Sequence, residues 1–310
     1  MTALPPDVRA LLTAWAARPA PAVGGLTPQR VRDDELDVLA LQRPPAALRS
    51  VEDVEVPGAA GPLAARLYRP REGRLPAMLF LHGGGFVIGR DGYDAPLRDL
   101  AEAGDCLLVA PGLRLAPEHP FPAAVDDALA VARWLARSAP SLGAASVSPG
   151  VGGDSSGGNL AAVTTLALTR DRIRPTFQLL IYPMLDATAS SPSYDEFASG
   201  FGFSSDKARW YFDQYLSGGT DRRDPRVSPL FAGDVAGLPP TLIATAEADP
   251  LRDDGERYAE RLAGAGVEVE RRRYPGMIHG FFQMTGALEG ARTLNHDLGA
   301  WIRARSGRPR

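Results

Sequence analysis

The chain alternates short apolar runs with segments whose apolar residues recur at helical spacing. The runs have the length of buried strands, and the helical patterns separate them from residue 77 onward. The predicted strands span residues 77–81, 106–110, 147–153, 177–182, 241–246 and 267–273, and the helices between them include 123–137, 157–169 and 255–263. This alternation predicts an α/β fold with a doubly wound, mostly parallel sheet.

Two helices and two strands are predicted ahead of this alternation. In the first helix, the apolar residues at positions 8, 11, 12 and 15 fall on one face. The second helix should start at Thr27-Pro28, a capping residue followed by proline, and end before Pro44. Strand-like segments follow at residues 51–56 and 64–68.

One segment, from Asp186 to about Gly233, interrupts the alternation and is dense in aromatic residues. They are Tyr194, Phe197, Phe201, Phe203, Trp210, Tyr211, Phe212 and Tyr215. Core packing explains part of this density. An aromatic insertion placed over the carboxyl ends of the strands is also typical of a lid over an apolar ligand pocket.

Composition narrows the function classes. The chain has 310 residues, 45% of them hydrophobic, and a net charge of −3, which argues against a nucleic-acid or anionic-membrane partner. The single cysteine, Cys106, lies in an apolar run, so we expect a buried thiol and no disulfide. The few His and Cys residues make a metal site improbable, and we expect no cofactor. No apolar stretch is long enough to span a membrane, and Asp7 and Arg9 interrupt any signal-peptide pattern, so we expect a cytoplasmic protein.

The most informative chemical motif is Gly153-Asp154-Ser155-Ser156-Gly157, in which a serine lies between two glycines. The motif is predicted to form a tight turn from strand to helix, crowded enough that Gly153 and Gly157 must lack a β-carbon. Such a turn exposes the Ser155 hydroxyl at a helix N-terminus. The alternative is an ordinary glycine-rich loop.

A second motif, His82-Gly83-Gly84-Gly85-Phe86, directly follows the strand at 77–81. Its main-chain N–H groups suit an oxyanion hole, completed by the N–H of Ser156. A phosphate-binding loop is the alternative, but no Lys stands near the following helix, and the dinucleotide-binding glycine pattern is absent.

A nucleophilic serine also needs a base and an orienting acid. Among the four histidines, His279 follows a late strand and lies in a loop, whereas His119 and His296 suit surface roles and His82 suits a brace for the glycine loop. Asp249 follows the strand at 241–246 and precedes Pro250, although it could instead only cap the next helix. Asp253 and Asp254 are the alternative acids. The chain order Ser155, Asp249, His279 is that of α/β-hydrolases.

Together these motifs resemble the microbial esterases related to hormone-sensitive lipase, in the α/β-hydrolase superfamily. The other matching segments are Arg114–Ala124, Asp249–Asp253 and Ile278–Phe281. The resemblance departs from the family pattern at Leu113, where an aromatic residue is usual, and at Pro149-Gly150, which should shorten the strand before Ser155.

The resemblance implies a carboxylesterase that acts on short to medium acyl chains through an acyl-enzyme. It assigns Ser155, His279 and Asp249 as nucleophile, base and acid, and Gly83, Gly84, Gly85 and Ser156 as oxyanion-hole donors. It also implies N-terminal cap helices at 1–45 and a catalytic domain at 46–310 with a cap insertion at 186–233. The open alternatives are a lactone, aryl formamide or amide hydrolase, or a non-catalytic receptor on the same fold. A homodimer is an oligomeric state that the sequence allows.

Overall fold

The fold is built on one eight-stranded sheet, seen in a computed structural model that describes residues 3–17, 23–145, 148–216 and 218–306. The strand order is β1-β2-β4-β3-β5-β6-β7-β8. The strands are β1 Ser50–Pro57, β2 Pro62–Arg69, β3 Ala77–Leu81, β4 Leu107–Pro111, β5 Gly150–Asp154, β6 Gln178–Ile181, β7 Thr241–Ala248 and β8 Val269–Ile278. Strand β2 is antiparallel to β1 and β4, and the other neighbours are parallel. The predicted mostly parallel sheet is confirmed.

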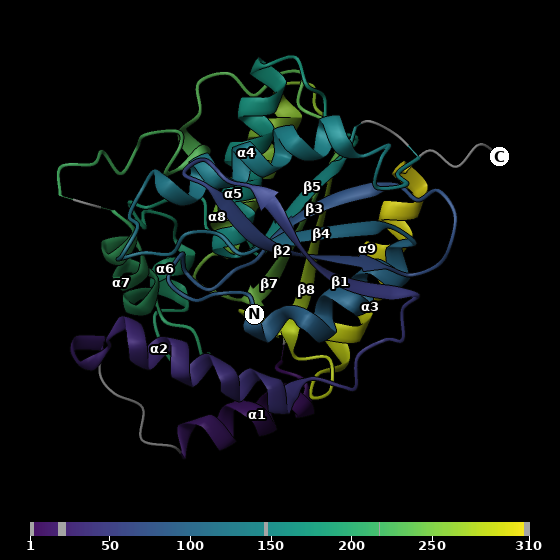
Figure 1. Ribbon diagram of the computed structural model, residues 1–310. Helices are drawn as coiled ribbons and strands as arrows, with labels where there is room; N and C mark the ends of the chain where they lie inside the picture. The colour runs from purple at the N-terminus through teal and green to yellow at the C-terminus, as the bar shows by residue number, and fades with distance from the viewer. Residues whose placement is uncertain (1–2, 18–22, 146–147, 217, 307–310) are drawn as a thin grey trace.

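Helices cover both faces of the sheet (Figure 1). The α-helices are α1 Pro6–Ala16, α2 Pro28–Glu35, α3 Asp94–Gly104, α4 Ala123–Ser138, α5 Ser156–Arg170, α6 Ser193–Glu196, α7 Ser205–Tyr215, α8 Arg252–Gly264 and α9 Glu289–Arg305. Short 3-10 helices are η1 Val23–Gly25, η2 Leu36–Leu41, η3 Asp91–Tyr93, η4 Pro229–Phe231 and η5 Phe281–Gln283. Helices α4, α5 and α8 lie on one face and α3 and α9 on the other, which is the doubly wound arrangement.

The central strand β3 shows why a continuous apolar run is needed here. All five of its residues are buried, and successive side chains point to opposite faces. Leu79 and Leu81 join the core under α4 and α5, whereas Met78 and Phe80 join the core under α3 and α9. A strand covered on both faces must therefore be apolar at every position.

Several predicted elements differ in extent from the structure, and the last strand, predicted at 267–273, spans Val269–Ile278. The second helix begins at Pro28, and the Thr27 hydroxyl accepts a hydrogen bond from the Arg30 N–H, but the α-helix ends at Glu35 and continues as η2. Strand β5 starts at Gly150, because Pro149 has no N–H to donate to a neighbouring strand. The shortened strand is thus confirmed, and residue 147, where the predicted strand began, lies outside the described part of the chain.

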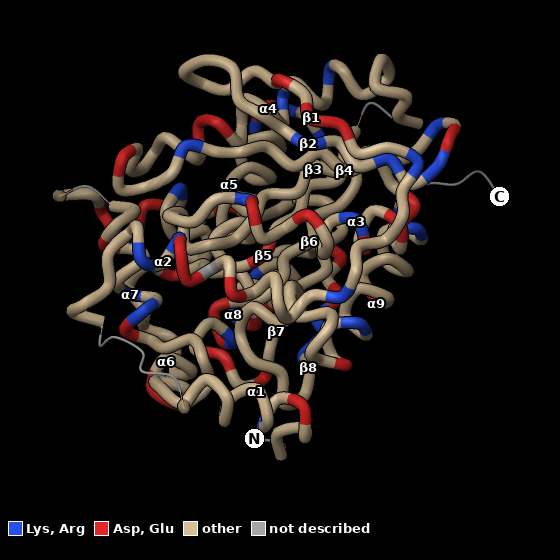
Figure 2. Tube along the Cα trace, turned by 60° about the horizontal axis from the view of Figure 1, so that its bottom comes forward, with Lys and Arg blue, Asp and Glu red and all other residues tan. Residues whose placement is uncertain are grey.

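The N-terminal helices and the 186–233 insertion lie together at one end of the sheet. Figure 1 shows α1 and α2 near α6 and α7. Charged positions are spread over the molecule, with Arg beside Asp or Glu in many places, as in the view of Figure 2. The Arg66–Asp53 and Arg71–Asp105 ion pairs are examples. The division into cap helices at 1–45 and a catalytic domain at 46–310 remains a prediction.

Candidate active site

The predicted site residues converge because each one directly follows a parallel strand. His82 follows β3, Ser155 follows β5, Asp249 follows β7 and His279 follows β8. Parallel strands place their carboxyl ends at one edge of the sheet, so segments far apart in the chain meet there. The sheet topology therefore brings the four residues to a common edge.

Ser155 lies at a sharp turn between β5 and α5. Its backbone has φ 51° and ψ −120°, a conformation that residues other than glycine rarely adopt. A β-carbon at Gly153 would lie 2.3 Å from the Gly157 carbonyl oxygen, and one at Gly157 would lie 2.0 Å from the Leu81 carbonyl oxygen. The prediction that both flanking glycines must lack a β-carbon is confirmed.

A hydrogen-bonded chain joins Ser155, His279 and Asp249. The Ser155 hydroxyl oxygen lies 2.9 Å from Nε2 of His279, and Nδ1 of His279 lies 2.8 Å from Oδ2 of Asp249. The Asp249 carboxylate can only accept, so Nδ1 carries the proton and Nε2 is left to accept from the serine. This is the tautomer that a general base requires.

Asp249 is fully buried and uses both of its oxygens. While Oδ2 accepts from His279, Oδ1 accepts from the Leu251 N–H at 2.8 Å, just ahead of α8. Asp249 is not the cap of the next helix, because α8 starts at Arg252 with Leu251 as its N-cap residue and no side-chain capping bond. The second bond fixes the carboxylate plane and thus the direction from which it meets the imidazole.

The remaining histidines and acids lie elsewhere. His119 and His296 are exposed. The Asp253 and Asp254 carboxylates face the start of the insertion, where Asp253 accepts from the Ser193 N–H and Asp254 from the Leu185 and Asp186 N–H groups. His82 is buried, and its Nδ1–H donates to the Gly83 carbonyl at 2.8 Å. Burial lowers the pKa of His82, which keeps its imidazole neutral.

The glycine loop is held by a buried network that sequence reasoning missed. Asp154 accepts from the Gly83 N–H at 2.8 Å and from the Tyr93 hydroxyl at 2.9 Å, and Gly83 also donates to that hydroxyl. The Gly83 N–H is thus already engaged, whereas Gly84 and Gly85 follow with positive φ values of 99° and 61°. The signal available in sequence was Asp154 itself, a charged residue at the end of a buried strand.

Ser156 contacts the same loop from the start of α5. Its hydroxyl accepts from the Phe86 N–H at 3.2 Å, so the first residue of the helix and the end of the glycine loop are joined. This bond sets the spacing between the Ser156 backbone and the backbone of the glycine loop.

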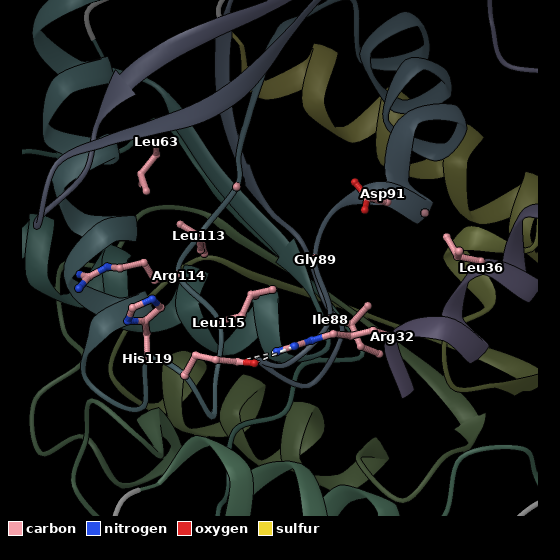
Figure 3. A pocket seen from close by; sticks show the side chains of 13 residues that line it. Arg32, Leu36, Leu63, Ile88, Gly89, Asp91, Leu113, Arg114, Leu115 and His119 are labelled. Atoms are coloured by element: carbon pink, nitrogen blue, oxygen red, sulfur yellow. Dashed lines mark hydrogen bonds and ion pairs between the residues drawn. The ribbon is translucent and has the colours of Figure 1, made fainter. Parts of the chain in front are cut away.

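A separate pocket of about 540 Å³ is lined by none of Ser155, His279 and Asp249 (Figure 3). Apolar side chains at its wall include Leu63, Ile88, Leu113 and Leu115. Arg32 of α2 crosses it, donating to the Val87 carbonyl at 2.9 Å and to both oxygens of Glu118. The pocket therefore lies beside the end of the glycine loop, and Arg32 ties the N-terminal helices to that loop.

Metal-binding clusters and membrane-spanning helices are both absent from the described residues. Within the described residues, no group of three or more His, Cys, Asp or Glu side chains is arranged to hold a metal ion. Over the same part of the chain, no helix combines the length and apolar character needed to cross a bilayer. Cys106 is buried, and burial raises the pKa of its thiol to about 12.

Comparison with known proteins places this geometry among ester hydrolases. Residues 78–283 match the family model described as the α/β-hydrolase fold. The carboxylic ester hydrolase LipN of Mycobacterium tuberculosis is 41% identical over 268 residues, which cover 83% of this chain and 71% of LipN. An ethyl acetate hydrolase of Pseudomonas putida is 40% identical over 74% of each chain. The solved structure of a hyperthermophilic esterase from the archaeon Pyrobaculum calidifontis superposes with a TM-score of 0.91 at 40% identity, covering 97% of this chain and 98% of the other.

Proposed function

The chain belongs to the α/β-hydrolase fold family and is a carboxylesterase of the hormone-sensitive-lipase-like kind, and on this premise we propose that Ser155, His279 and Asp249 perform the hydrolysis. The substrates are carboxylic esters with short to medium acyl chains. The reaction passes through an acyl-enzyme on Ser155. The hydrogen-bonded chain from Ser155 through His279 to buried Asp249 is the observation that carries the proposal.

In the first half of the reaction, the Ser155 oxygen attacks the ester carbonyl carbon while its proton passes to Nε2 of His279. Asp249 stabilises the resulting imidazolium through the Nδ1–H bond. The tetrahedral intermediate collapses when the bond to the alcohol oxygen breaks, and His279 gives its proton to the departing alcohol. Water then attacks the acyl-enzyme with the same proton transfers, which releases the carboxylic acid and restores Ser155.

The negative charge on the former carbonyl oxygen is stabilised by main-chain N–H groups of Gly84, Gly85 and Ser156. Gly83 acts indirectly, since its N–H is bonded to Asp154 and Tyr93. Its contribution is to hold the loop in place. The four residues expected to form the oxyanion hole thus divide into three donors and one anchor.

The substrate range follows from the cap. One aromatic side chain of the insertion lies over His279, since Phe203 stacks on it at 4.3 Å between ring centroids. A roofed site of this kind favours small acyl groups. The name of the Pseudomonas putida relative, an ethyl acetate hydrolase, agrees with a small acyl group.

The test is labelling with an organophosphonate ester, followed by mass spectrometry of the modified peptide. We expect the label on Ser155 and loss of labelling in Ser155→Ala and His279→Ala. Ser156→Ala tests the neighbouring hydroxyl: it should still be labelled on Ser155, but more slowly, because the Ser156 hydroxyl accepts from the Phe86 N–H of the glycine loop. Labelling of Ser156, or an active Ser155→Ala enzyme, would refute the assignment.

Lactones, aryl formamides and amides are alternative substrates for the same residues. Comparing kcat/KM on p-nitrophenyl butyrate, a lactone of similar size and the matching anilide separates them. We expect the ester to be hydrolysed with the highest kcat/KM. A higher value for the lactone or the anilide would keep the proposed triad and change the substrate class.

A further inference from the structure

The imidazole of His279 contacts two aromatic rings from different parts of the molecule. Tyr182, which follows β6, is tilted by 58° with its centroid 4.7 Å away. Phe203, from the cap insertion, is stacked at 25° and 4.3 Å. Tyr182 is fully buried, whereas Phe203 is half-buried. One of the two rings therefore comes from the segment that follows the sheet strand β6 and the other from the cap.

The position of Phe203 depends on a contact with the N-terminal helix. Gly202, just before it, has φ +83°, and a β-carbon there would lie 2.6 Å from Cζ3 of Trp15. The indole of Trp15 therefore occupies the space that a side chain at 202 would need. The Phe203 N–H donates to the Phe201 carbonyl at 3.1 Å, which closes a tight turn around this glycine. The Phe203 ring is thus held by the turn that Trp15 packs against.

The same N-terminal segment is anchored to the strand that carries His279. A β-carbon at Gly276 of β8 would lie 2.4 Å from Cδ of Pro5. Asp7 of α1 accepts a hydrogen bond from the Glu289 N–H, at the start of α9, at 2.9 Å. Helix α1 therefore contacts both the segment before His279 and the cap turn that covers it.

From these contacts we propose that α1 is a brace for the catalytic base, acting through Trp15, Gly202 and Phe203. The inference rests on the proposed role of His279. Asp249 holds the imidazole by a single bond at Nδ1, and a ring held at one edge can still tilt about that bond. Tilting moves Nε2, at the far edge of the ring, the most. The rings of Tyr182 and Phe203 stop that tilt and preserve the 2.9 Å approach to Ser155.

In this proposal Trp15 and Phe203 are positioning residues. Trp15 packs against Gly202 and acts on the reaction only through Phe203. Misplacing a reacting group by about 1 Å can cost about 100-fold in rate. A partial loss of the stack should therefore lower the rate of serine attack by about tenfold. Substrate binding should change much less, because in this proposal Trp15 acts only through the position of the imidazole.

The experiment measures the second-order rate of Ser155 labelling by p-nitrophenyl methylphosphonate, whose small acyl mimic makes little demand on the cap. The variants are Trp15→Ala, Trp15→Phe and Leu11→Ala, with His279→Ala as the reference for a lost base. Leu11 is the matched control because it is also half-buried on the apolar face of α1. Thermal unfolding of each variant measures the loss of packing.

We expect Trp15→Ala to label about tenfold more slowly than the wild type and to lower kcat for p-nitrophenyl acetate with little change in KM. Trp15→Phe should recover most of the rate, since an aromatic ring still fills the space beside Gly202. Leu11→Ala should lose thermal stability and keep the labelling rate. Should Trp15→Ala unfold, Phe203→Leu and Phe203→Tyr make the same comparison at the other end of the brace, with only the leucine variant slowed.

Two results would refute the proposed role of α1 and leave the proposed roles of Ser155, His279 and Asp249 unaffected. They are a wild-type labelling rate in Trp15→Ala or Phe203→Leu, and an equal slowing in Leu11→Ala. If His279 is not the base, the outcome is different, because His279→Ala would then be labelled as fast as the wild type.

Discussion

Replacing Tyr93 by phenylalanine tests whether a buried network sets the geometry of the oxyanion loop. The change removes one hydroxyl, which donates to Asp154 at 2.9 Å and accepts from the Gly83 N–H at 2.9 Å. Tyr93 and Asp154 are each about 1% exposed, so solvent does not replace the lost bond. Gly83 keeps its bond to Oδ1 of Asp154, and Oδ2 keeps its contact of 3.4 Å with the Tyr182 hydroxyl.

The magnitude follows from the charge of Asp154. A hydrogen bond to a charged group contributes about 1.5–3 kcal/mol, so the free energy of unfolding should fall by about that amount. Removing an oxyanion donor outright costs about 100- to 1,000-fold in kcat. Tyr93→Phe only loosens the loop that presents Gly84 and Gly85, and we expect kcat/KM on p-nitrophenyl acetate to fall by about tenfold.

The assay pairs ester hydrolysis with urea unfolding, and Tyr258→Phe is the matched control. Tyr258 is also fully buried, on α8, and its hydroxyl has no hydrogen-bond partner among the described residues. Losing that hydroxyl should leave activity unchanged and stability unchanged or higher. If the two variants behave alike, the Tyr93 hydroxyl does not hold the loop, and the reasoning fails.

Three further predictions follow from the site and its surroundings. Gly157→Ala should abolish activity and destabilise the fold, since its β-carbon would lie 2.0 Å from the Leu81 carbonyl oxygen; activity and circular dichroism together check this, and an active, folded variant would contradict it. Glu118→Gln should lower the free energy of unfolding at pH 7 by less than about 1 kcal/mol, because the ion pair is partly exposed. The hydrogen bond from Arg32 lowers the pKa of Glu118 from 4.5 to about 2, so this stabilisation is present above pH 4.5 and is lost as the pH falls through about 2. The difference in the free energy of unfolding between Glu118→Gln and the wild type should therefore shrink as the pH falls from 4.5 to about 2. A difference that grows over this interval in acid unfolding curves would contradict the prediction. Finally, kcat/KM on p-nitrophenyl esters should rise and then fall with acyl length, as each methylene adds about 0.8 kcal/mol of burial until the pocket is full. A steady rise to emulsified long-chain lipids would instead indicate an open, lipase-like site.

The amino-acid sequence determined the parts of this protein that depend on local patterns. Apolar runs and helical spacing predicted the sheet and its flanking helices. A strand buried on both faces is apolar at every position, and a helix buried on one face has apolar residues at helical spacing, so both can be read along the chain. The glycines around Ser155 predicted the strained turn. The conflict at Gly153 is local, with the Gly157 carbonyl, whereas that at Gly157 is with the Leu81 carbonyl of β3 and arises only in the folded chain. Ser155, Asp249 and His279 were also identified by their order along the chain and by their places after predicted strands.

The tertiary structure decided which groups those local elements present to one another. The N–H of Gly83 bonds to Asp154, 71 positions along the chain, and is therefore unavailable to an oxyanion. No local pattern could show this, nor that Trp15 would pack beside Gly202 and bring Phe203 onto His279. Such contacts join segments that have no period or spacing in common. They depend on how helices from both ends of the chain pack over the sheet, and packing is a property of the whole fold.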